Sequence, residues 1–515
     1  MTPQRTVVIV PAPTANGDLH VGHLCGPFLA GDVFARQLRA SGHGTLFATG
    51  IQESQTYVVS TARRLGVSPE QLSRQSWSQV QRTLSVLGIS VDGFAPGDAR
   101  FQKLLLDFLT RLRDAGRLRL RTMTFPYSER TGEFLVDGYV RGACPVCLAS
   151  SCGGVCESCG HPNNPGELLE PQSTADPTEQ LTTREAQVLV LPLEDYREQL
   201  LAYFDRPGRV ARPHMMQAVR EMLQRPLPDF PVTYPISWGI PVPFPEVAGQ
   251  VVNPAAEAMP AGMCSSAVAA ERQGIILNSD DELWLAGSGT RVVYFCGFDN
   301  TQPFAIAGLA LLMAHGDRYV LPEALLTNEF YELDYEKFST SRGHVVWAHE
   351  LAGELPRDGI RFFLASTSPE FQRTNFNRHA LGTVVQSRLV EPWNRIATTV
   401  NTWLDGQRDG WAGRPLPVSD RARTAAATMA QRFAAQTALS TFSLNRLAEL
   451  IGEQLARLEE LAAGVPPAED PPARLADLCY QVEAFLRCAG PVLIDLTNRV
   501  LGEDATEVPA VPAVP

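Results

Sequence analysis

The chain opens on a buried strand, a polar loop and the start of a helix. Residues 6–12, TVVIVPA, join β-branched residues to a proline and predict a parallel strand that is covered on both faces. After the loop PTANGD the pattern from about Val21 to Ala40 is helical, and TLFATG then forms a second short strand. A strand–loop–helix–strand opening predicts a doubly wound α/β sheet.

The full length of 515 residues exceeds one small domain, and the pattern changes character along it. Helical patterns cover 69–86, 99–115 and 193–224, whereas residues from about 118 to 175 alternate like strands and indicate an insertion. DGIRFFLAS fits a strand or a helix. From about 379 to 500 one helical pattern follows another, which favours a bundle, and EDATEVPAVPAVP is typical of a disordered tail.

The net charge of −12 argues against broad, non-specific nucleic-acid binding, which depends on neutralising phosphates, although it does not exclude a local basic groove. No apolar run approaches the roughly 20 residues that span a bilayer. The N-terminus, MTPQRTVVIVPAPTANG, has no hydrophobic segment followed by a cleavage site. We therefore expect a cytoplasmic protein without a membrane partner.

Two histidines flank a glycine in LHVGHL, where the first loop meets the helix. Free backbone amides and the helix dipole favour anions at such a place. His20 and His23 are three residues apart, so they share one face and can donate to phosphate oxygens. Gly22 leaves room for a flat ring to approach the backbone. The alternative is a pair of surface histidines without a role, which the preceding PTANG disfavours.

Five of the ten cysteines lie between Cys144 and Cys159, in a chain without a secretion signal. Clustered pairs in that setting indicate a metal site rather than disulfides. The spacing Cys144-x2-Cys147-x8-Cys156-x2-Cys159 makes two knuckles, whose four thiolates complete a tetrahedral site for zinc. Four thiolates leave no open position, so the zinc would be structural. The alternative is a set of unrelated free thiols.

A second polar loop, EKFSTSRGH, carries cations and hydroxyls at Lys337, Ser339, Ser341 and Arg342. These groups suit a charge that develops on a pyrophosphate. The chain has only two lysines, Lys103 and Lys337, among 44 basic residues, so a lysine that remains within a motif is informative. In isolation, a polar loop before a helix is the favoured interpretation.

Together and in this order, the features resemble class I aminoacyl-tRNA synthetases, and most closely the methionyl-tRNA synthetases. PTANGDLHVGHL is similar to that family's P-Y-A-N-G-x-x-H-x-G-H, and SWGIPVP matches a segment that many members carry. CPVC, CESCG and ELLEPQS resemble the family's zinc knuckle and the strand after it, and KFSTSR resembles its K-x-S-K-S loop. The resemblance covers about residues 5–400 well and the bundle weakly.

The resemblance implies a Rossmann-type catalytic domain that is split by a connective insertion and followed by an α-helical bundle. The expected parts are the first catalytic half at 1–117, the zinc-knuckle insertion at 118–232, the second half at 233–370, the anticodon-domain-like bundle at 371–502 and the disordered tail at 503–515. The implied reaction is attack of an amino acid carboxylate on the α-phosphate of ATP, with Mg²⁺, followed by acyl transfer to a tRNA.

The ATP site implied by the resemblance has two halves. His20 and His23 would hold the phosphates, and Gly22 would face adenine. The remaining positions would be Asp299 on the nucleotide, Lys337 on pyrophosphate, and Ser339, Ser341 and Arg342 beside it.

Departures from the family cluster in the amino-acid pocket. The family's G-T-D-E-H-G reads GIQESQ here, so Gln52 replaces the aspartate that would hold the substrate ammonium, with Glu53 adjacent. Large or polar pocket residues change at the aligned positions Ala12, Thr14, Ala255, Gly262 and Phe304, the last being Ala305 if one residue is inserted. Several large side chains that shrink together leave a cavity costing several kcal/mol unless something fills it.

Misalignment between 246 and 275 is the alternative explanation, yet no Trp or Tyr lies between Phe244 and Leu283. Thr340 stands where the loop would have its second lysine, and losing one transition-state donor costs on the order of 10²–10³ in rate. In the bundle, RLEELAAGVPPAED offers no counterpart of the family's anticodon-reading Y-x-x-x-x-x-P-W. PWNRIATTVN retains Trp393, Asn394 and Arg395.

Three hypotheses remain open. We favour a divergent paralogue that adenylates a carboxylate other than methionine and passes the acyl group to tRNA or to a small amine, which would make it an amide ligase. An ordinary methionine–tRNA ligase with relaxed motifs is the second. A non-catalytic tRNA- or protein-binding module is the third, and the retained His20, Gly22, His23 and Lys337 count against it.

Overall fold

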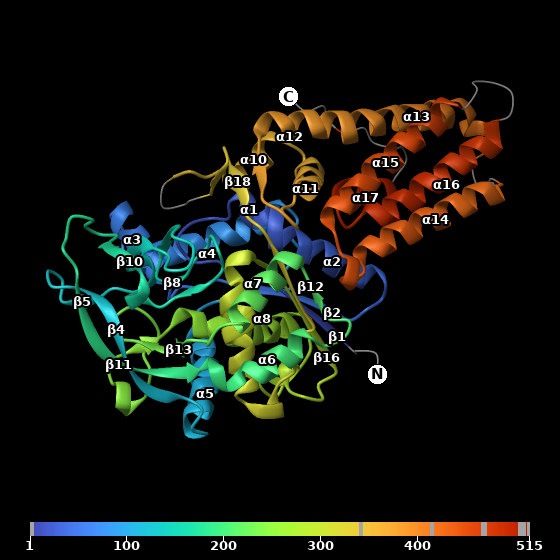
Figure 1. Ribbon diagram of the computed structural model, residues 1–515. Coiled ribbons are helices and arrows are strands. Elements are labelled where there is room, and N and C mark those ends of the chain that lie inside the picture. The colour runs from blue at the N-terminus through green and yellow to red at the C-terminus, as the bar shows by residue number, and fades with distance from the viewer. Residues whose placement is uncertain (1–4, 339–342, 412–416, 465–470, 503–510, 512–515) are drawn as a thin grey trace.

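The computed structural model describes residues 5–338, 343–411, 417–464, 471–502 and 511. Its centre is a six-stranded sheet in the order β12-β17-β16-β1-β2-β3, in which every neighbouring pair is parallel. The strands are β1 (Arg5–Ile9), β2 (Thr45–Gly50), β3 (Gly93–Ala95), β12 (Val210–Ala211), β16 (Thr290–Gly297) and β17 (Ala324–Asn328). The predicted doubly wound α/β sheet is confirmed, with helices packed around it (Figure 1).

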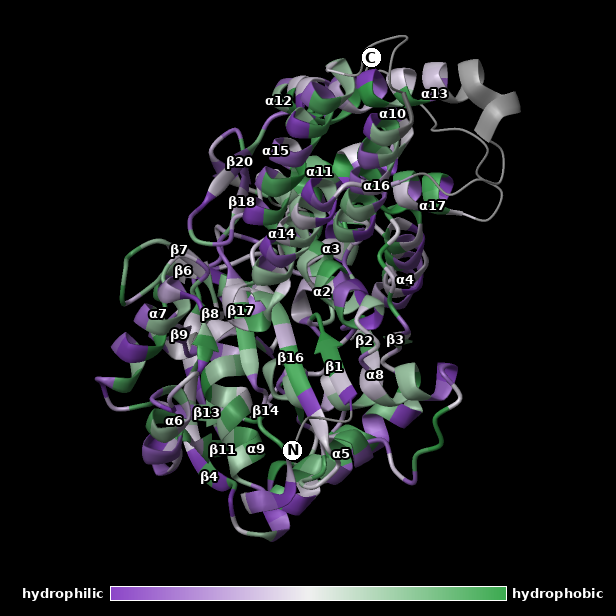
Figure 2. Ribbon diagram, turned by 90° about the vertical axis from the view of Figure 1, so that its right-hand side faces the viewer, coloured by the Kyte–Doolittle hydropathy of each residue, from purple (hydrophilic) through white to green (hydrophobic). Residues whose placement is uncertain are grey.

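Strand β1 is buried on both faces because its alternate side chains enter two different cores. Val8 packs in one core with α2 (Leu29–Ala40) and with residues of the C-terminal helices. Val7 packs in the other with α5 (Ala99–Asp114) and α8 (Ala258–Arg272). The strands at the centre of the molecule are correspondingly hydrophobic (Figure 2). This burial on both faces explains the continuous apolar run in the sequence.

The insertion is built from antiparallel strands, as its alternating pattern predicted. The long strands β4 (Arg119–Ser128) and β11 (Thr182–Pro192) pair with each other, and β11 also pairs with β13 (Asp229–Pro231). The smaller strands are β5 (Glu133–Phe134), β6 (Val140–Ala143), β7 (Ser150–Cys152), β8 (Gly154–Val155), β9 (Pro162–Asn163) and β10 (Leu169–Ser173). The β6–β7 and β8–β9 pairs carry the cysteine cluster.

Two sequence-based expectations need revision or completion. The stretch 193–224 is not helical throughout, because α6 (Arg197–Phe204) and α7 (Pro213–Leu223) are separated by β12, which adds the edge strand of the central sheet. DGIRFFLAS, which fitted a strand or a helix, lies in helix α11 (Arg357–Ser366). The helix expected at 69–86 is confirmed as α4 (Pro69–Val86), with Ser68 as its N-cap.

The C-terminal helices form the predicted bundle beside the sheet (Figure 1). After α11 they are α12 (Arg378–Val385), α13 (Glu391–Trp411), α14 (Asp420–Thr437), α15 (Leu444–Ala463), α16 (Pro471–Ala489) and α17 (Ile494–Leu501). The expected tail at 503–515 lies outside the described residues, apart from Val511. Within the described ranges, no helix combines the length and the apolar character that crossing a membrane requires.

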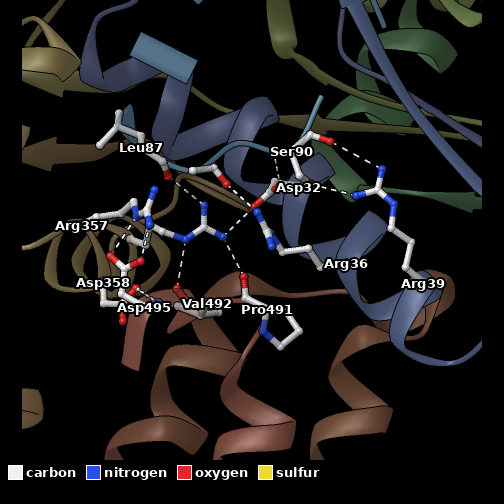
Figure 3. Close-up of polar contacts among 12 residues, drawn as sticks. Asp32, Arg36, Arg39, Leu87, Ser90, Arg357, Asp358, Pro491, Val492 and Asp495 are labelled. Atoms are coloured by element: carbon white, nitrogen blue, oxygen red, sulfur yellow. Dashed lines mark hydrogen bonds and ion pairs between the residues drawn. The ribbon is translucent and has the colours of Figure 1, made fainter. Parts of the chain in front are cut away.

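One buried ion pair joins helix α2, which packs on the central sheet, to helix α11 (Figure 3). Asp32 of α2 and Arg361 of α11 are almost completely buried, and Nη2 of the arginine lies 2.6 Å from Oδ2 of the aspartate. The guanidinium also donates to the backbone carbonyl oxygens of Leu87 (3.2 Å), Pro491 (2.7 Å) and Val492 (3.0 Å). A single side chain therefore links α2, the end of α4 and the turn before α17.

Two more residues of α11 hold the start of α17 (Figure 3). The carboxylate of Asp358 accepts hydrogen bonds from the backbone N–H groups of Asp495 (3.1 Å) and Leu496 (2.7 Å), which satisfies two donors at the helix N-terminus. Arg357 donates from Nε to Oδ2 of Asp495 at 2.9 Å. Helix α17 is thus positioned by polar contacts with α11 as well as by apolar packing.

Asp32 is held in its ionised form. Burial alone would raise the pKa of Asp32, but Arg361, Arg36 and the hydrogen bonds from Ser90 together lower that pKa below its ordinary value. Nε of Arg36 lies 2.9 Å from Oδ2, while Ser90 donates to Oδ1 through its N–H (2.7 Å) and its hydroxyl (2.6 Å). Losing Arg361 would leave this buried charge poorly compensated.

We expect Arg361→Leu to lower the free energy of unfolding by about 3–5 kcal/mol, because it breaks a buried pair by removing one partner. The matched control Arg446→Leu breaks an exposed pair with Glu449 and should cost less than about 1 kcal/mol. Adding Asp32→Leu to Arg361→Leu should recover part of the loss, since it removes the stranded carboxylate. Urea unfolding followed by circular dichroism measures all three. Equal losses for the two arginine variants would contradict the role of the buried pair.

Candidate active site

The polar residues of the first motif lie where the carboxyl ends of β1 and β16 meet. From β1 the chain continues to β2 on one side, while β16 lies on the other side, so the strand order reverses between β1 and β16. In open α/β sheets, such a switch point forms the crevice in which ligands bind. A cavity of about 960 Å³ opens at this place. It is lined by the predicted residues Ala12, His20, Gly22, His23, Gln52, Ala255, Gly262, Asp299 and Phe304.

His20 and His23 are oriented by backbone hydrogen bonds at the start of α1 (Val21–His23). The N–H of Gly22 donates to Nδ1 of His20 (3.1 Å), and the N–H of His20 donates to Nδ1 of His23 (3.3 Å). The two rings stack with their centroids 3.8 Å apart. Because each Nδ1 accepts a hydrogen bond, each neutral ring carries its proton on Nε2. The pair therefore presents two N–H donors with a fixed orientation.

Asp18, which the sequence analysis did not single out, fixes the loop before these histidines. One of its oxygens accepts from the N–H of Leu19 (2.7 Å), and the other accepts from the hydroxyl of Thr83 (2.7 Å) and contacts Nδ1 of His349 (2.7 Å). Asp18 thereby ties the loop to α4 and to α10 (Ala348–Glu354). A buried aspartate directly after an Asn-Gly turn was the signal for this role.

The second motif lies beside the first. The N–H of Val21 donates to the carbonyl oxygen of Val346 at 3.0 Å, and the ring of Phe338 stacks on His20 with centroids 5.0 Å apart. Lys337 belongs to β19 (Glu336–Lys337), which pairs with β18 (Tyr331–Leu333). The side chain of Lys337 lies outside the described part of the chain, as do residues Ser339, Thr340, Ser341 and Arg342.

Asp299 stands on the strand next to the histidine loop. It follows β16 in a short 3-10 turn (Phe298–Asn300), and its Oδ1 accepts a hydrogen bond from Nδ2 of Asn300 at 3.0 Å. A Cβ at Gly297 would lie 2.6 Å from this oxygen, so the glycine leaves space for the carboxylate. Asp299 and His20 thus face one crevice from neighbouring strands.

Gln52 also lines the cavity, and its side chain is engaged by the protein itself. Its Nε2 donates to the carbonyl oxygen of Pro254 (2.7 Å) and to Oε2 of Glu257 (3.2 Å). Glu257, which sequence reasoning missed, is buried and lines the cavity. Burial raises the pKa of Glu257 to about 7, against the lowering effects of the nearby Ser54 hydroxyl and the Gln52 amide. A lone acid in the apolar run PAAEAMPAG was the signal for it.

The space beside Gly262 is filled from other elements. A Cβ at Gly262 would lie 2.2 Å from the hydroxyl oxygen of Tyr294 and 3.1 Å from the Trp284 ring. Both aromatic residues are fully buried, and the Tyr294 ring packs on Phe304 with centroids 5.4 Å apart. Phe304 lines the cavity, whereas Ala305, the alternative position, is buried behind it. Tyr294 of β16 therefore fills the space beside Gly262, while Ala12 and Ala255 still line the open cavity.

The four predicted metal ligands converge. Sγ of Cys144 lies 3.8 Å from that of Cys159, Sγ of Cys147 lies 3.6 Å from that of Cys156, and all four lie within 4.8 Å of one another. A tetrahedron with zinc–sulfur distances of about 2.3 Å has sulfur–sulfur edges of about 3.8 Å, so the thiols fit a zinc ion. Cys152 stands outside the cluster and lines the cavity. The cluster is consistent with a zinc knuckle.

The close approach at Gly262 gives a direct test of the packing. Gly262→Ala should destabilise the protein by about 1–3 kcal/mol, because the new methyl group overlaps the Tyr294 hydroxyl. Tyr294→Phe removes that hydroxyl, so the double variant should regain most of the loss. Gly353→Ala is the control, since its Cβ would meet no atom within 4 Å in helix α10 and should be neutral or stabilising. Thermal unfolding measures the set, and additive effects would contradict the contact.

Comparison with known proteins agrees with this geometry. The family model tRNA synthetases class I (M) matches residues 6–400. The methionine–tRNA ligase of Roseiflexus sp. (strain RS-1) is 32% identical over 446 residues, which is 85% of this chain and 75% of that protein. The methionine–tRNA ligase of Thermococcus onnurineus (strain NA1) is 30% identical over 419 residues, which is 78% of this chain and 57% of that protein.

Solved structures show the same fold. The crystal structure of Mycobacterium tuberculosis methionyl-tRNA synthetase bound by methionyl-adenylate has a TM-score of 0.71 at 20% identity, and it covers 99% of this chain and 98% of its own. A second structure of that enzyme with methionyl-adenylate has a TM-score of 0.71 at 21% identity. The chain belongs to the class I aminoacyl-tRNA synthetases of the methionyl type, a family of ATP-dependent ligases.

Proposed function

We propose that this protein forms an acyl adenylate from ATP and a carboxylic acid other than methionine, and that it transfers the acyl group to an amine or to tRNA. One observation carries the proposal. The ordered histidine pair opens onto a pocket in which Tyr294 closes the space beside Gly262 and Glu257 lies buried against Gln52. A thioether has no hydrogen-bond donor to offer Glu257.

The chemistry follows from the family. An oxygen of the substrate carboxylate attacks the α-phosphorus of ATP, the bond to the bridging oxygen breaks, and pyrophosphate leaves. A second nucleophile, an amine or a tRNA hydroxyl, then attacks the acyl carbon and loses a proton, and AMP leaves. Mg²⁺, which is expected to accompany ATP, supplies charge neutralisation on the phosphates.

We assign the nucleotide to the end of the cavity that holds the histidines. The two fixed Nε2–H donors of His20 and His23 suit phosphate oxygens. Gly22 would face adenine, and Asp299 would contact the nucleotide from the neighbouring strand. The loop would act on pyrophosphate through Lys337, Ser339, Ser341 and Arg342.

The contacts that three residues of the bundle make within the protein favour a small amine over tRNA as the acceptor of the acyl group. Asn394 exchanges hydrogen bonds with the backbone of Val511 (2.8 and 2.9 Å), and Arg395 pairs with Glu459. Trp393 is fully buried. Trp393 and Asn394 are therefore engaged within the protein rather than displayed for an anticodon, whereas Arg395 lies on the surface in its ion pair with Glu459.

An ordinary methionine–tRNA ligase is the second candidate. The observation in its favour is that the relatives with 30–32% identity carry that name. It requires methionine to be accepted in the pocket beside Glu257, and it requires the bundle to bind tRNA.

We propose that Cys144, Cys147, Cys156 and Cys159 hold a structural zinc ion. Each knuckle places a left-handed residue four positions after its first cysteine, Leu148 (φ 63°) and Gly160 (φ 74°). The insertion offers these short strands little apolar core of their own, so the bound ion would supply the folding free energy.

ATP–pyrophosphate exchange, screened over the amino acids and methionine derivatives, tests the main proposal. We expect exchange with an acid other than methionine, and little with methionine itself. His23→Ala should reduce that exchange on the order of 10²–10³-fold, which separates it from contaminating activity. Exchange with no acid would end the proposal. Charging of tRNA with methionine would establish the second candidate instead.

Metal content and heating test the zinc proposal. We expect about one zinc ion per chain, and a chelator should lower the melting temperature because folding of the insertion is coupled to metal binding. Cys147→Ser should lose the ion. The control Cys152→Ser, in the same insertion but outside the cluster, should retain it. Equal melting temperatures with and without chelator would contradict the assignment.

A further inference from the structure

Glu257 is a buried carboxylate whose partners inside the protein are incomplete. It ends a 3-10 turn (Pro254–Glu257) before α8, and the residue is 2% exposed. Its Oε2 accepts the hydrogen bond from Gln52, whereas its Oε1 makes no well-oriented hydrogen bond in the part of the chain that the structure describes, and the nearby Ser54 hydroxyl is the other polar group that lowers its pKa. An unpaired buried carboxylate oxygen is costly, so each case needs an explanation outside the packing itself.

Among the described residues, no cation is one of the groups that shift the pKa of Glu257. Both amide protons of Gln52 are engaged, one by Pro254 and one by Glu257. The charged group that faces Glu257 is a second carboxyl group, Glu53, whose pKa burial raises. The polar neighbour is the hydroxyl of Ser54. Two carboxyl groups without a compensating cation attract a positively charged ligand.

The cavity as a whole is also lined by more acidic than basic residues. Among the described residues that line it there is one arginine, Arg141, against eight acidic residues. The acidic residues are Asp18, Glu53, Asp137, Glu157, Asp229, Glu257, Asp299 and Glu329. Asp18 and Asp299 belong to the histidine loop and the expected nucleotide site, whereas Glu53 and Glu257 face each other beside Gln52.

We propose that Glu257, oriented by Gln52, is the specificity residue that receives an amine on the side chain of the carboxylic substrate. An ammonium group would complete Oε1 and compensate the buried charge with a charge-assisted hydrogen bond. The inference rests on the proposed adenylation, because it names the chemistry of the acid that is activated. The substrate class is an acid that carries an amine on its side chain, such as a diamino acid.

Two matched series of acids test the proposal by ATP–pyrophosphate exchange. The six-carbon series is hexanoate, L-norleucine, 6-aminohexanoate and L-lysine, which carry no amine, an α-amine, an ω-amine and both. The four-carbon series is butanoate, L-2-aminobutanoate, 4-aminobutanoate and L-2,4-diaminobutanoate. We expect the best acid with an ω-amine to exceed its counterpart without that amine in kcat/KM by on the order of 10²-fold, because the acid without it leaves Glu257 unpaired. A gain that comes from the α-amine alone would overturn the proposal.

Glu257→Gln keeps the shape of the side chain and removes its charge. This variant should reduce the gain from the amine at least about ten-fold. The matched control Glu198→Gln, on the exposed surface of α6, should leave the gain unchanged. At pH 8 the Glu257→Gln variant should be at least as heat-stable as the parent protein, because it removes an uncompensated buried charge. A clear loss of stability would show a structural role and overturn the proposal.

The pH dependence gives a second readout. Because burial raises the pKa of Glu257 to about 7, the carboxyl group is mostly neutral below that pH. KM for the amine-bearing acid should fall about ten-fold per pH unit as the pH rises toward 7, and it should level off above. Glu257→Gln should lose this step, while the titration of Glu53, whose pKa burial also raises, remains.

Several outcomes would overturn the proposal. Equal use of amine-bearing and amine-free acids is one, and a gain from the amine that Glu257→Gln does not reduce is another. If a different acid from the wider screen is the better substrate, the same comparison is made with its des-amino counterpart. In each of these cases ATP–pyrophosphate exchange is still observed, so the proposed adenylation stands. If no acid supports exchange, both the adenylation and the amine site are excluded.

Discussion

The buried pair of Asp32 and Arg361 sets how the second half of the chain meets the first. Helix α11 carries Arg361, and the segment before it pairs with the histidine loop through Val21 and Val346. The same helix caps α17 with Asp358. A buried ion pair adds little net stability over apolar residues of equal size, but breaking it is costly. Its effect is to select one docking geometry, in which the crevice and the bundle are positioned by the same helix.

Much of the fold is predictable from the sequence, because the strand–loop–helix opening, the cysteine spacing and the helical bundle depend on local patterns. Strand β12 is not, since two residues between helices carry no periodicity and become a strand only because β17 offers its edge. The contact between Gly262 and Tyr294 joins segments far apart in the chain, and a tyrosine in an apolar strand looks like any core residue. In the sequence, Glu257 is recognisable as a single acidic residue among alanines and prolines. Only the folded structure shows that its second oxygen makes no well-oriented hydrogen bond among the described residues.

In the pocket, the residues that fill the volume differ from the residues that supply the polar groups. The small residues at Ala255 and Gly262 predicted a costly void, and the structure fills the space beside Gly262 with Tyr294 and Trp284 from other elements. Packing density is thereby kept, because the volume is supplied from a different direction. The polar groups beside this space are a buried carboxylate at Glu257 and an amide at Gln52, which are joined by a hydrogen bond.

Alternate side chains of β1 point to opposite faces of the central sheet, which divides the molecule into two sides. Ile9 and Tyr294 face the side that carries the pocket, while Val8 and Phe295 face the side that receives the bundle. Effects of substitutions that share no neighbours tend to add, so changes on the two sides of the sheet combine with little interference. Substitutions can therefore change which substrate the pocket accepts without changing how the C-terminal helices dock on the sheet. The sheet that forms the crevice therefore also separates substrate specificity from the docking of the bundle, so that specificity can evolve independently.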